Sequence, residues 1–130
     1  MYKRLLSIIL LSVLALGVSM AANKRFTLVI DAGHGGKDAG ACGKTSKEKN
    51  LTLKYALAFG KIVERNCPDV KVVYTRKTDT FLELWQRAEI ANKNKANLFV
   101  SVHINALEGG KVARGIQTYT LGKGETTGKK

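Results

Sequence analysis

Three short apolar runs, separated by two helical patterns, constrain the fold of this chain more than any other feature. The runs cover residues 25–30, 70–75 and 98–104, and the turn residues that follow the first run at once are typical of a buried strand. The helical patterns begin at Thr45 and Thr80. Strand, helix, strand, helix, strand is the order of an α/β fold, so we expect a mixed, mostly parallel sheet with helices on both faces.

The first helix has a start signal, a periodic body and a stop signal. Thr45 and Glu48 have the spacing of a capping box, in which each side chain accepts a hydrogen bond from the other residue's backbone N–H. Apolar and small residues recur at helical spacing from Leu53 onwards, and the pattern ends near Asn66 because Pro68 follows.

The second helix shows the same start signal at Thr80 and Glu83. Glu83 precedes Arg87 by four residues, which favours an ion pair on one face of the helix. Beyond the third apolar run, a Gly-rich turn leads to residues 115–121, which we predict to be a fourth strand.

The first 21 residues predict a secretory signal peptide. Two basic residues precede an apolar run at 5–18, and Ser19 and Ala21 fit the small-residue rule for cleavage. A retained membrane anchor is the alternative, but the run is short for a span and no cysteine follows it to carry a lipid. Cleavage would leave residues 22–130 as one small domain in the periplasm or outside the cell, without a stable membrane anchor.

The chain is strongly basic, which favours an anionic partner. Its formal net charge is +12, and loss of the two basic residues of the leader lowers this to +10. An exported protein meets the phosphate- and carboxylate-rich cell envelope more often than nucleic acid. We therefore expect a wall polymer as the partner, and no nucleic acid.

The chain contains two cysteines, Cys42 and Cys67. Outside the cytoplasm they could form a disulfide. Two free thiols are an equal alternative, because a single pair of cysteines does not give the pattern of a disulfide-rich fold.

Residues at the ends of two predicted strands suggest a metal site. His34 follows the first strand and His103 ends the third, so parallel strands would bring both to one edge of the sheet. Glu48, in the first turn of the first helix, is placed to approach that edge. Two imidazoles and a carboxylate suit Zn²⁺ and leave a position for a water nucleophile. Each residue also has a structural explanation, as a turn histidine, a capping glutamate and a core histidine.

A nucleotide site is a weaker alternative for the same loop. Residues 38–45 end in the Gly-Lys-Thr of a phosphate-binding loop. Asp38 replaces the first glycine of that pattern, and its charge would repel a phosphate. The pattern also starts well after the strand.

Five segments carry a resemblance to a known family. They are VIDAGHGGKDAG, KEKNLTL, VVYTRKTDTFLELWQRAEIAN, NLFVSVHINA and ARGIQTYTL, and together they run from about Phe26 to Leu121. In this order and spacing they resemble the zinc-dependent N-acetylmuramoyl-L-alanine amidases of bacterial cell-wall turnover. The resemblance implies that His34, Glu48 and His103 are the zinc ligands.

The resemblance also implies roles for neighbouring residues. Asp31 and Asn105 would orient the ligands or shape their loops, and Arg76 would support the site or contact the substrate. Arg87 also falls in a matched segment, although pairing with Glu83 explains it equally well.

The implied reaction is hydrolysis of the amide between N-acetylmuramic acid and L-alanine in peptidoglycan, with Zn²⁺ as cofactor. The family's general base is a glutamate on a late strand, which the resemblance places beyond Lys130. We therefore expect residues 22–130 to be the N-terminal part of the catalytic domain, with its C-terminal part missing. A non-catalytic zinc- or wall-binding module is the alternative, and the sequence identifies no regulatory activator.

Overall fold

The computed structural model describes residues 25–106 and 115–120 of the 130-residue chain. Its centre is a parallel sheet with strand order β2-β1-β3. The strands are β1 at Phe26–Ala32, β2 at Val70–Tyr74 and β3 at Leu98–Val102. Because β1 lies in the middle, its backbone pairs on both sides and its carboxyl end lies beside that of β3.

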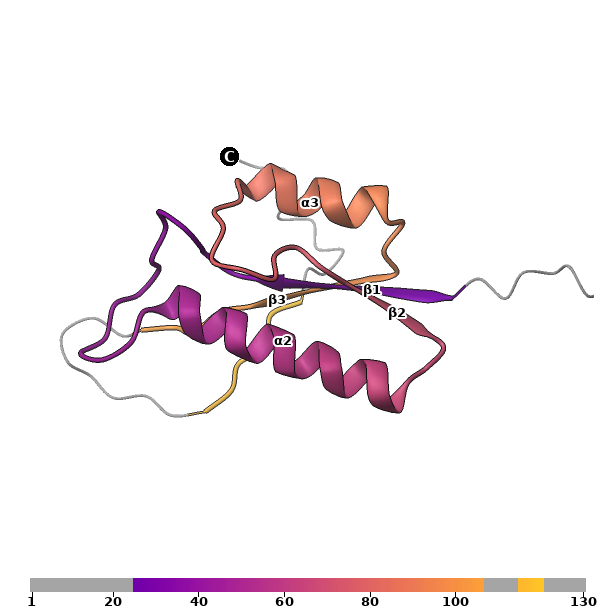
Figure 1. The fold of residues 1–130 in the computed structure, drawn as a ribbon, viewed down its shortest axis with the longest axis horizontal. Coiled ribbons are helices and arrows are strands. Elements are labelled where there is room, and N and C mark those ends of the chain that lie inside the picture. Colours follow the sequence, from indigo (N-terminus) through magenta and orange to yellow (C-terminus); the bar gives the residue numbers. More distant parts are fainter. Residues whose placement is uncertain (1–24, 107–114, 121–130) are drawn as a thin grey trace, which may run out of the picture.

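Two helices connect the strands. Helix α2, Glu48–Asn66, leads from β1 to β2, and α3, Leu84–Lys93, leads from β2 to β3. Figure 1 shows the two helices on opposite sides of the strands. The two crossovers run in opposite directions across the sheet, so right-handed connections place their helices on opposite faces. The expected α/β class with a parallel sheet and helices is confirmed.

Alternate residues of β1 face the two helices. Leu28, Ile30 and Ala32 pack with Ala56 of α2 in the main apolar cluster. Partly buried residues extend this cluster along α2, β2 and β3, namely Leu53, Val63, Val70, Val72, Tyr74, Val100 and Val102. The opposite face of β1 carries Asp31, so a charged side chain is buried on the α3 side of the sheet.

The helix starts differ from their predictions. Helix α2 begins at Glu48 with Lys47 at the N-cap and no side-chain cap, so the predicted capping box at Thr45 is wrong. The reason is that the Glu48 carboxylate bonds to other segments and cannot reach back. Helix α3 has a capping box, but between Glu83 and Gln86, one turn after the predicted start.

The predicted fourth strand is wrong for residues 115–120, which form no strand, while residue 121 lies outside the described residues. Ile116 and Tyr119 are 96% and 80% exposed, so this segment pairs with no sheet edge and buries no apolar face. A stable strand needs both backbone pairing with a sheet edge and burial of an apolar face.

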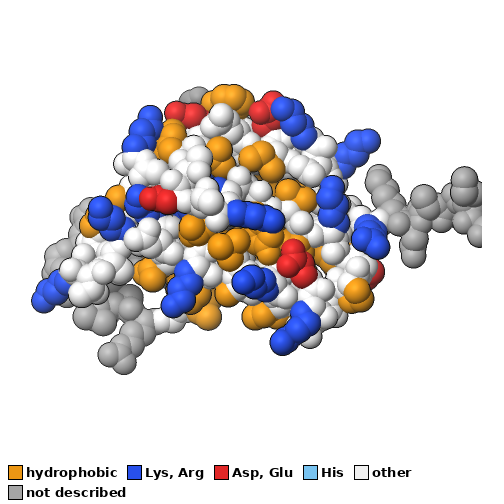
Figure 2. Space-filling model, in the orientation of Figure 1, with side chains coloured by type: hydrophobic (Ala, Val, Ile, Leu, Met, Phe, Trp, Pro, Cys, Tyr) orange, Lys and Arg blue, Asp and Glu red, His pale blue; other side chains and the backbone are white. Residues whose placement is uncertain are grey.

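Other predictions about the whole chain are tested only in part. The predicted signal peptide lies outside the described residues. Within 25–106 and 115–120, the structure contains no helix with the length and hydropathy needed to cross a membrane. Cys42 and Cys67 are both exposed and free. Lys and Arg side chains are scattered over the face shown in Figure 2 and do not gather into one stripe.

Candidate metal centre

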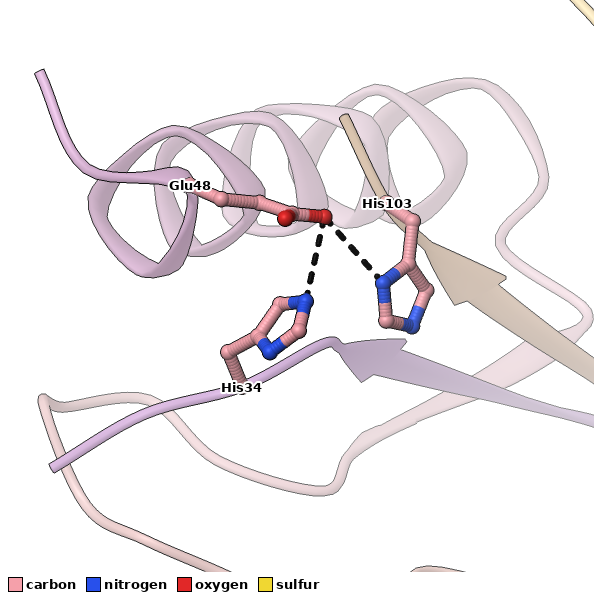
Figure 3. Close-up of side chains that lie close together, drawn as sticks. All are labelled: His34, Glu48 and His103. Carbon is pink, nitrogen blue, oxygen red and sulfur yellow. Dashed lines mark hydrogen bonds and ion pairs between the residues drawn. The ribbon is translucent and has the colours of Figure 1, made fainter. Parts of the chain in front are cut away.

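The carboxyl ends of β1 and β3 bring two histidines together beside the start of α2. His34 lies two residues after β1, His103 directly follows β3, and Glu48 is the first residue of α2. Glu48 Oε1 lies 3.1 Å from His34 Nε2 and 3.2 Å from His103 Nδ1. Figure 3 shows the Glu48 carboxylate pointing toward both rings. One ligand atom from each residue lies within 4.8 Å of the others. This His–Glu–His cluster could hold a metal ion.

Glu48 is buried and ionised. Its Oε2 accepts a hydrogen bond from the backbone N–H of Ala41 at 2.9 Å, and its Oε1 accepts one from that of Ile104 at 2.8 Å. Burial opposes ionisation of the carboxyl group, but these hydrogen bonds and the two histidines outweigh it and lower the pKa of Glu48. The carboxylate therefore carries its charge at neutral pH and is available to a cation.

The backbone around His34 is fixed by two buried arginines. His34 has a φ of 63°, in the left-handed region that non-glycine residues rarely adopt. Arg87 donates to the carbonyl groups of Ala32 and His34, each at 2.9 Å. Arg76 donates to those of Ala32 at 2.9 Å and Gly33 at 2.8 Å. Three consecutive carbonyl groups are thus bound by guanidinium groups, which sets the position of His34.

The ring of His34 has a carboxylate partner on the side away from Glu48. Asp38 Oδ2 lies 2.9 Å from His34 Nδ1, and Asp38 Oδ1 accepts the backbone N–H of Gly40 at 3.0 Å. The Gly40 hydrogen bond, followed by that of His34, lowers the pKa of Asp38. An ionised carboxylate only accepts hydrogen bonds, so Nδ1 of His34 is the donor in this pair.

Two glycines allow the loop to pass close to the cluster. A Cβ at Gly33 would overlap the ring of His103. Gly40 has a φ of +62°, and a Cβ there would lie 2.7 Å from both Glu48 Oε2 and His34 Cδ2. Gly33 and Gly40 are therefore explained by close approach of the backbone to the side chains of the cluster.

Asp31, near the carboxyl end of β1, connects three segments. Its Oδ1 accepts hydrogen bonds from Thr75 at 2.6 Å and Arg87 at 2.8 Å, and its Oδ2 accepts one from Ser101 at 2.6 Å. Burial opposes its ionisation, but these donors outweigh it and lower the pKa of Asp31. The predicted pairing of Arg87 with Glu83 is wrong, because Arg87 lies on the buried face of α3 and pairs with Asp31.

Arg76 is buried beside the cluster, whereas Asn105 is exposed. Arg76 is 4% exposed and also donates to the carbonyl groups of Lys49 and Thr78, so it contacts backbone and lies outside the cluster. Asn105 lies two residues after His103 and is exposed. Among the described residues it makes no hydrogen bond with the cluster.

The sequence did not reveal the contacts that brace the Gly-rich loop. Asp79 Oδ1 accepts the backbone N–H of Gly36 at 2.7 Å, and Asp79 Oδ2 pairs with Lys49 at 2.6 Å. Lys49 in turn donates to the carbonyl group of Gly36 at 2.9 Å. Asp38 and Asp79 lie in loops, where no periodic pattern could have pointed to these roles.

The loop does not have the geometry of a nucleotide site. In a phosphate-binding loop, the Gly-Lys-Thr segment enters the helix directly. Here Lys44 and Thr45 are exposed, and α2 begins only at Glu48.

A cavity of about 650 Å³ adjoins the cluster between α3 and the sheet. His34, His103 and Asp38 line one part of it. Its remaining wall is mainly apolar and includes Phe81, Leu82, Leu84, Ala88, Ala91 and Phe99. The cluster is therefore accessible from a hollow in the protein surface, and the His103 side chain is 46% exposed.

Residues 28–130 match the protein family described as N-acetylmuramoyl-L-alanine amidase. The chain belongs to this amidase family. The endolysin of Bacillus phage SPP1 is 50% identical over 90 residues, which is 69% of this chain and 32% of the endolysin.

Solved amidase structures have the same fold. The catalytic domain of CwlV, an N-acetylmuramoyl-L-alanine amidase from Bacillus (Paenibacillus) polymyxa var. colistinus, has 48% identity and a TM-score of 0.62, covering 65% of this chain and 48% of that one. An N-acetylmuramoyl-L-alanine amidase from Clostridium difficile 630 has 40% identity and a TM-score of 0.65, covering 69% and 49%. The expected family is confirmed, and the chain spans about a third to a half of the length of these relatives.

Proposed function

We propose that this chain carries the zinc site of a peptidoglycan amidase. One observation carries the proposal: in a chain of the amidase family, two imidazoles and an ionised, buried carboxylate converge within 4.8 Å. This donor set fits Zn²⁺, which prefers nitrogen with one anionic oxygen, better than Mg²⁺ or Ca²⁺, which prefer oxygen alone. His34, Glu48 and His103 would hold the ion.

The proposed reaction is hydrolysis of the amide between N-acetylmuramic acid and L-alanine. A bound zinc ion supplies a Lewis acid for the amide carbonyl group and acidifies a water molecule. The exposed side of His103 and the adjoining cavity give a substrate access to the cluster. The net charge of +10, which remains without Lys3 and Arg4 of the leader, favours association with an acidic wall polymer.

The general base of this reaction would come from outside the described residues. A base must have a pKa near the working pH to accept a proton effectively. The carboxyl groups at the cluster, Asp31, Asp38 and Glu48, all have a lowered pKa and bind other groups. The family resemblance implies a glutamate beyond Lys130 as the base, and we propose this assignment.

Residues 1–21 also support a proposal about where the chain acts. Residues 1–21 have the pattern of an export signal, and peptidoglycan lies outside the cytoplasmic membrane. We propose that the chain acts in the periplasm or outside the cell.

Digestion of purified peptidoglycan tests the proposed reaction. The zinc-loaded protein that carries this chain should release peptides with new L-alanine amino termini, detected by amine labelling. His103→Ala should abolish this release, and Glu64→Gln, an exposed change near the other end of α2, should retain it. New reducing sugar ends instead of new amino termini would contradict an amidase.

A wall-binding module without hydrolysis is the second candidate, favoured because Asp38 and Glu48, which contact the histidines, both have a lowered pKa and bind other groups. It predicts that the protein that carries this chain sediments with peptidoglycan and releases no amino termini, even when it is loaded with zinc.

A further inference from the structure

We propose that Asp38 is a positioning residue that selects Nε2 of His34 as the metal-binding atom and fixes its ring in the cluster. The inference rests on the proposed zinc site. Asp38 Oδ2 lies 2.9 Å from Nδ1 of His34, while Nε2 of the same ring lies 3.1 Å from Glu48 Oε1. The carboxylate and the metal position are therefore on opposite sides of one imidazole.

The hydrogen-bond chemistry determines which nitrogen is free. Both nitrogens of His34 face a carboxylate, but the hydrogen bond of the ring is to Asp38, whose Oδ2 accepts from Nδ1 at 2.9 Å, whereas Nε2 only lies near Glu48, at 3.1 Å. A cation held by both Nε2 and Glu48 would need the lone pair of Nε2, so Nδ1 is the nitrogen that keeps the proton. The neutral ring then has its lone pair on Nε2, directed toward Glu48 and the centre of the cluster. A ligand histidine whose second nitrogen donates to a carboxylate is held in one tautomer and one orientation, and it is a more basic ligand.

Asp38 is itself oriented by the loop that contains it. Its Oδ1 accepts the backbone N–H of Gly40 at 3.0 Å. Its backbone forms a two-way bridge with Gly35, with N···O distances of 2.9 and 3.0 Å. The loop thus encloses the His34 ring between Asp38 and Glu48.

The second histidine has no such partner among the described residues. Nδ1 of His103 faces Glu48 at 3.2 Å, and its ring lies over Gly33 with 46% of the side chain exposed. The two imidazoles therefore differ: His34 is oriented before the metal binds, and His103 can adjust as the metal binds. Asp38 should matter to metal affinity more than its half-exposed position suggests.

Zinc affinity of the full chain, measured by competition with a chromophoric chelator, tests this role. We expect Asp38→Ala to weaken binding about 10- to 100-fold, the usual loss when a histidine ligand loses its carboxylate. Asp38→Asn should weaken it less, because the amide oxygen can still accept from Nδ1.

Asp79→Asn is the matched control. Asp79 also braces the Gly-rich loop, through Gly36 and Lys49, but no contact joins it to His34. Its effect on zinc affinity should be about fivefold or less, as for other exposed ion pairs. Equal losses in the Asp38 and Asp79 variants would overturn the proposal, since general loop bracing would then explain both.

Nitrogen-detected NMR of the histidine rings gives a readout besides affinity. In the zinc-loaded chain, His34 should show a protonated Nδ1 whose proton exchanges slowly with water, and Asp38→Ala should make this exchange fast. A protonated Nε2 in the wild type would overturn the proposal. Absence of zinc binding by the wild-type chain would instead contradict the zinc site itself, so the two failures are distinguishable.

Discussion

Arg87 of α3 donates to Asp31 of β1 across 2.8 Å, and both side chains are buried, with 6% and 3% of their surface exposed. The same guanidinium group binds the carbonyl group of His34 at 2.9 Å. The pair therefore joins the α3 side of the sheet to the backbone of a cluster residue, and it connects the stability of the fold with the geometry of the site.

Loss of this pair should destabilise the protein strongly. Arg87→Leu leaves a buried carboxylate without its counter-charge and should lower the free energy of unfolding by about 3–5 kcal/mol, measured by urea denaturation. Glu83→Gln, which changes the partner expected from the sequence, retains a capping oxygen and should cost less than about 1 kcal/mol. A larger loss of unfolding free energy in the Glu83 variant than in the Arg87 variant would instead support the ion pair between Glu83 and Arg87 that the sequence suggested.

The ionisation of Asp31 predicts how stability depends on pH. Its pKa in the folded protein is lowered below the ordinary value of 3.8. The charge therefore contributes stability above that value, and the contribution is lost as pH falls through the folded pKa. Denaturation of the wild type and Asp31→Asn between about pH 3 and pH 7 should show their difference shrinking on the acid side. A stability difference between the two proteins that grows toward acid pH would mean that folding raises the pKa of Asp31.

Gly60 should tolerate alanine poorly, although it lies within a helix. Alanine in place of glycine usually stabilises a helix by about 1 kcal/mol. Here a Cβ would overlap the ring and hydroxyl of Tyr74, so Gly60→Ala should instead cost about 1–3 kcal/mol. The double variant Gly60→Ala/Tyr74→Leu should lose less than the sum of the two single changes. Additive losses would show that the overlap does not occur.

Gly40 should be required for metal binding more than for folding. Gly40→Ala would strain a residue at φ +62° and move the carboxylate of Glu48 or the ring of His34, lowering zinc affinity in a chelator competition. Gly43→Ala is the control in the same loop, since its Cβ would make only ordinary contact with Ser46 at 3.6 Å. Equal zinc affinities in the two variants would contradict the close approach at Gly40.

The sequence predicted the element order because each strand and helix has a local signal. The α/β class follows from three apolar runs and two helical patterns, and the positions of His34 and His103 at strand ends placed both at one sheet edge. Glu48 was found as well, but its capping role was wrong because its carboxylate bonds to Ala41 and Ile104.

The remaining contacts depend on tertiary structure and carry no local signal. Asp31 lies 56 positions from Arg87, so the nearby Glu83 was the partner that spacing favoured. Asp38 belongs to an irregular loop, where its contact with His34 depends on the folding of the loop around the ring. The strand predicted at residues 115–121 failed for 115–120, because a local sequence pattern does not ensure that a segment pairs with the sheet, and Ile116 and Tyr119 remain exposed.

Zinc content of the purified chain, determined by native mass spectrometry, tests the central claim most directly. The account predicts one zinc ion per chain in the wild type and in Glu64→Gln, and none retained in Glu48→Gln, which stays folded by circular dichroism. Glu48 and Glu64 lie on the same helix, and only Glu48 contacts the two histidines. A wild-type chain that is folded and holds no zinc, or a Glu48 variant that holds it equally well, would contradict the proposed metal centre.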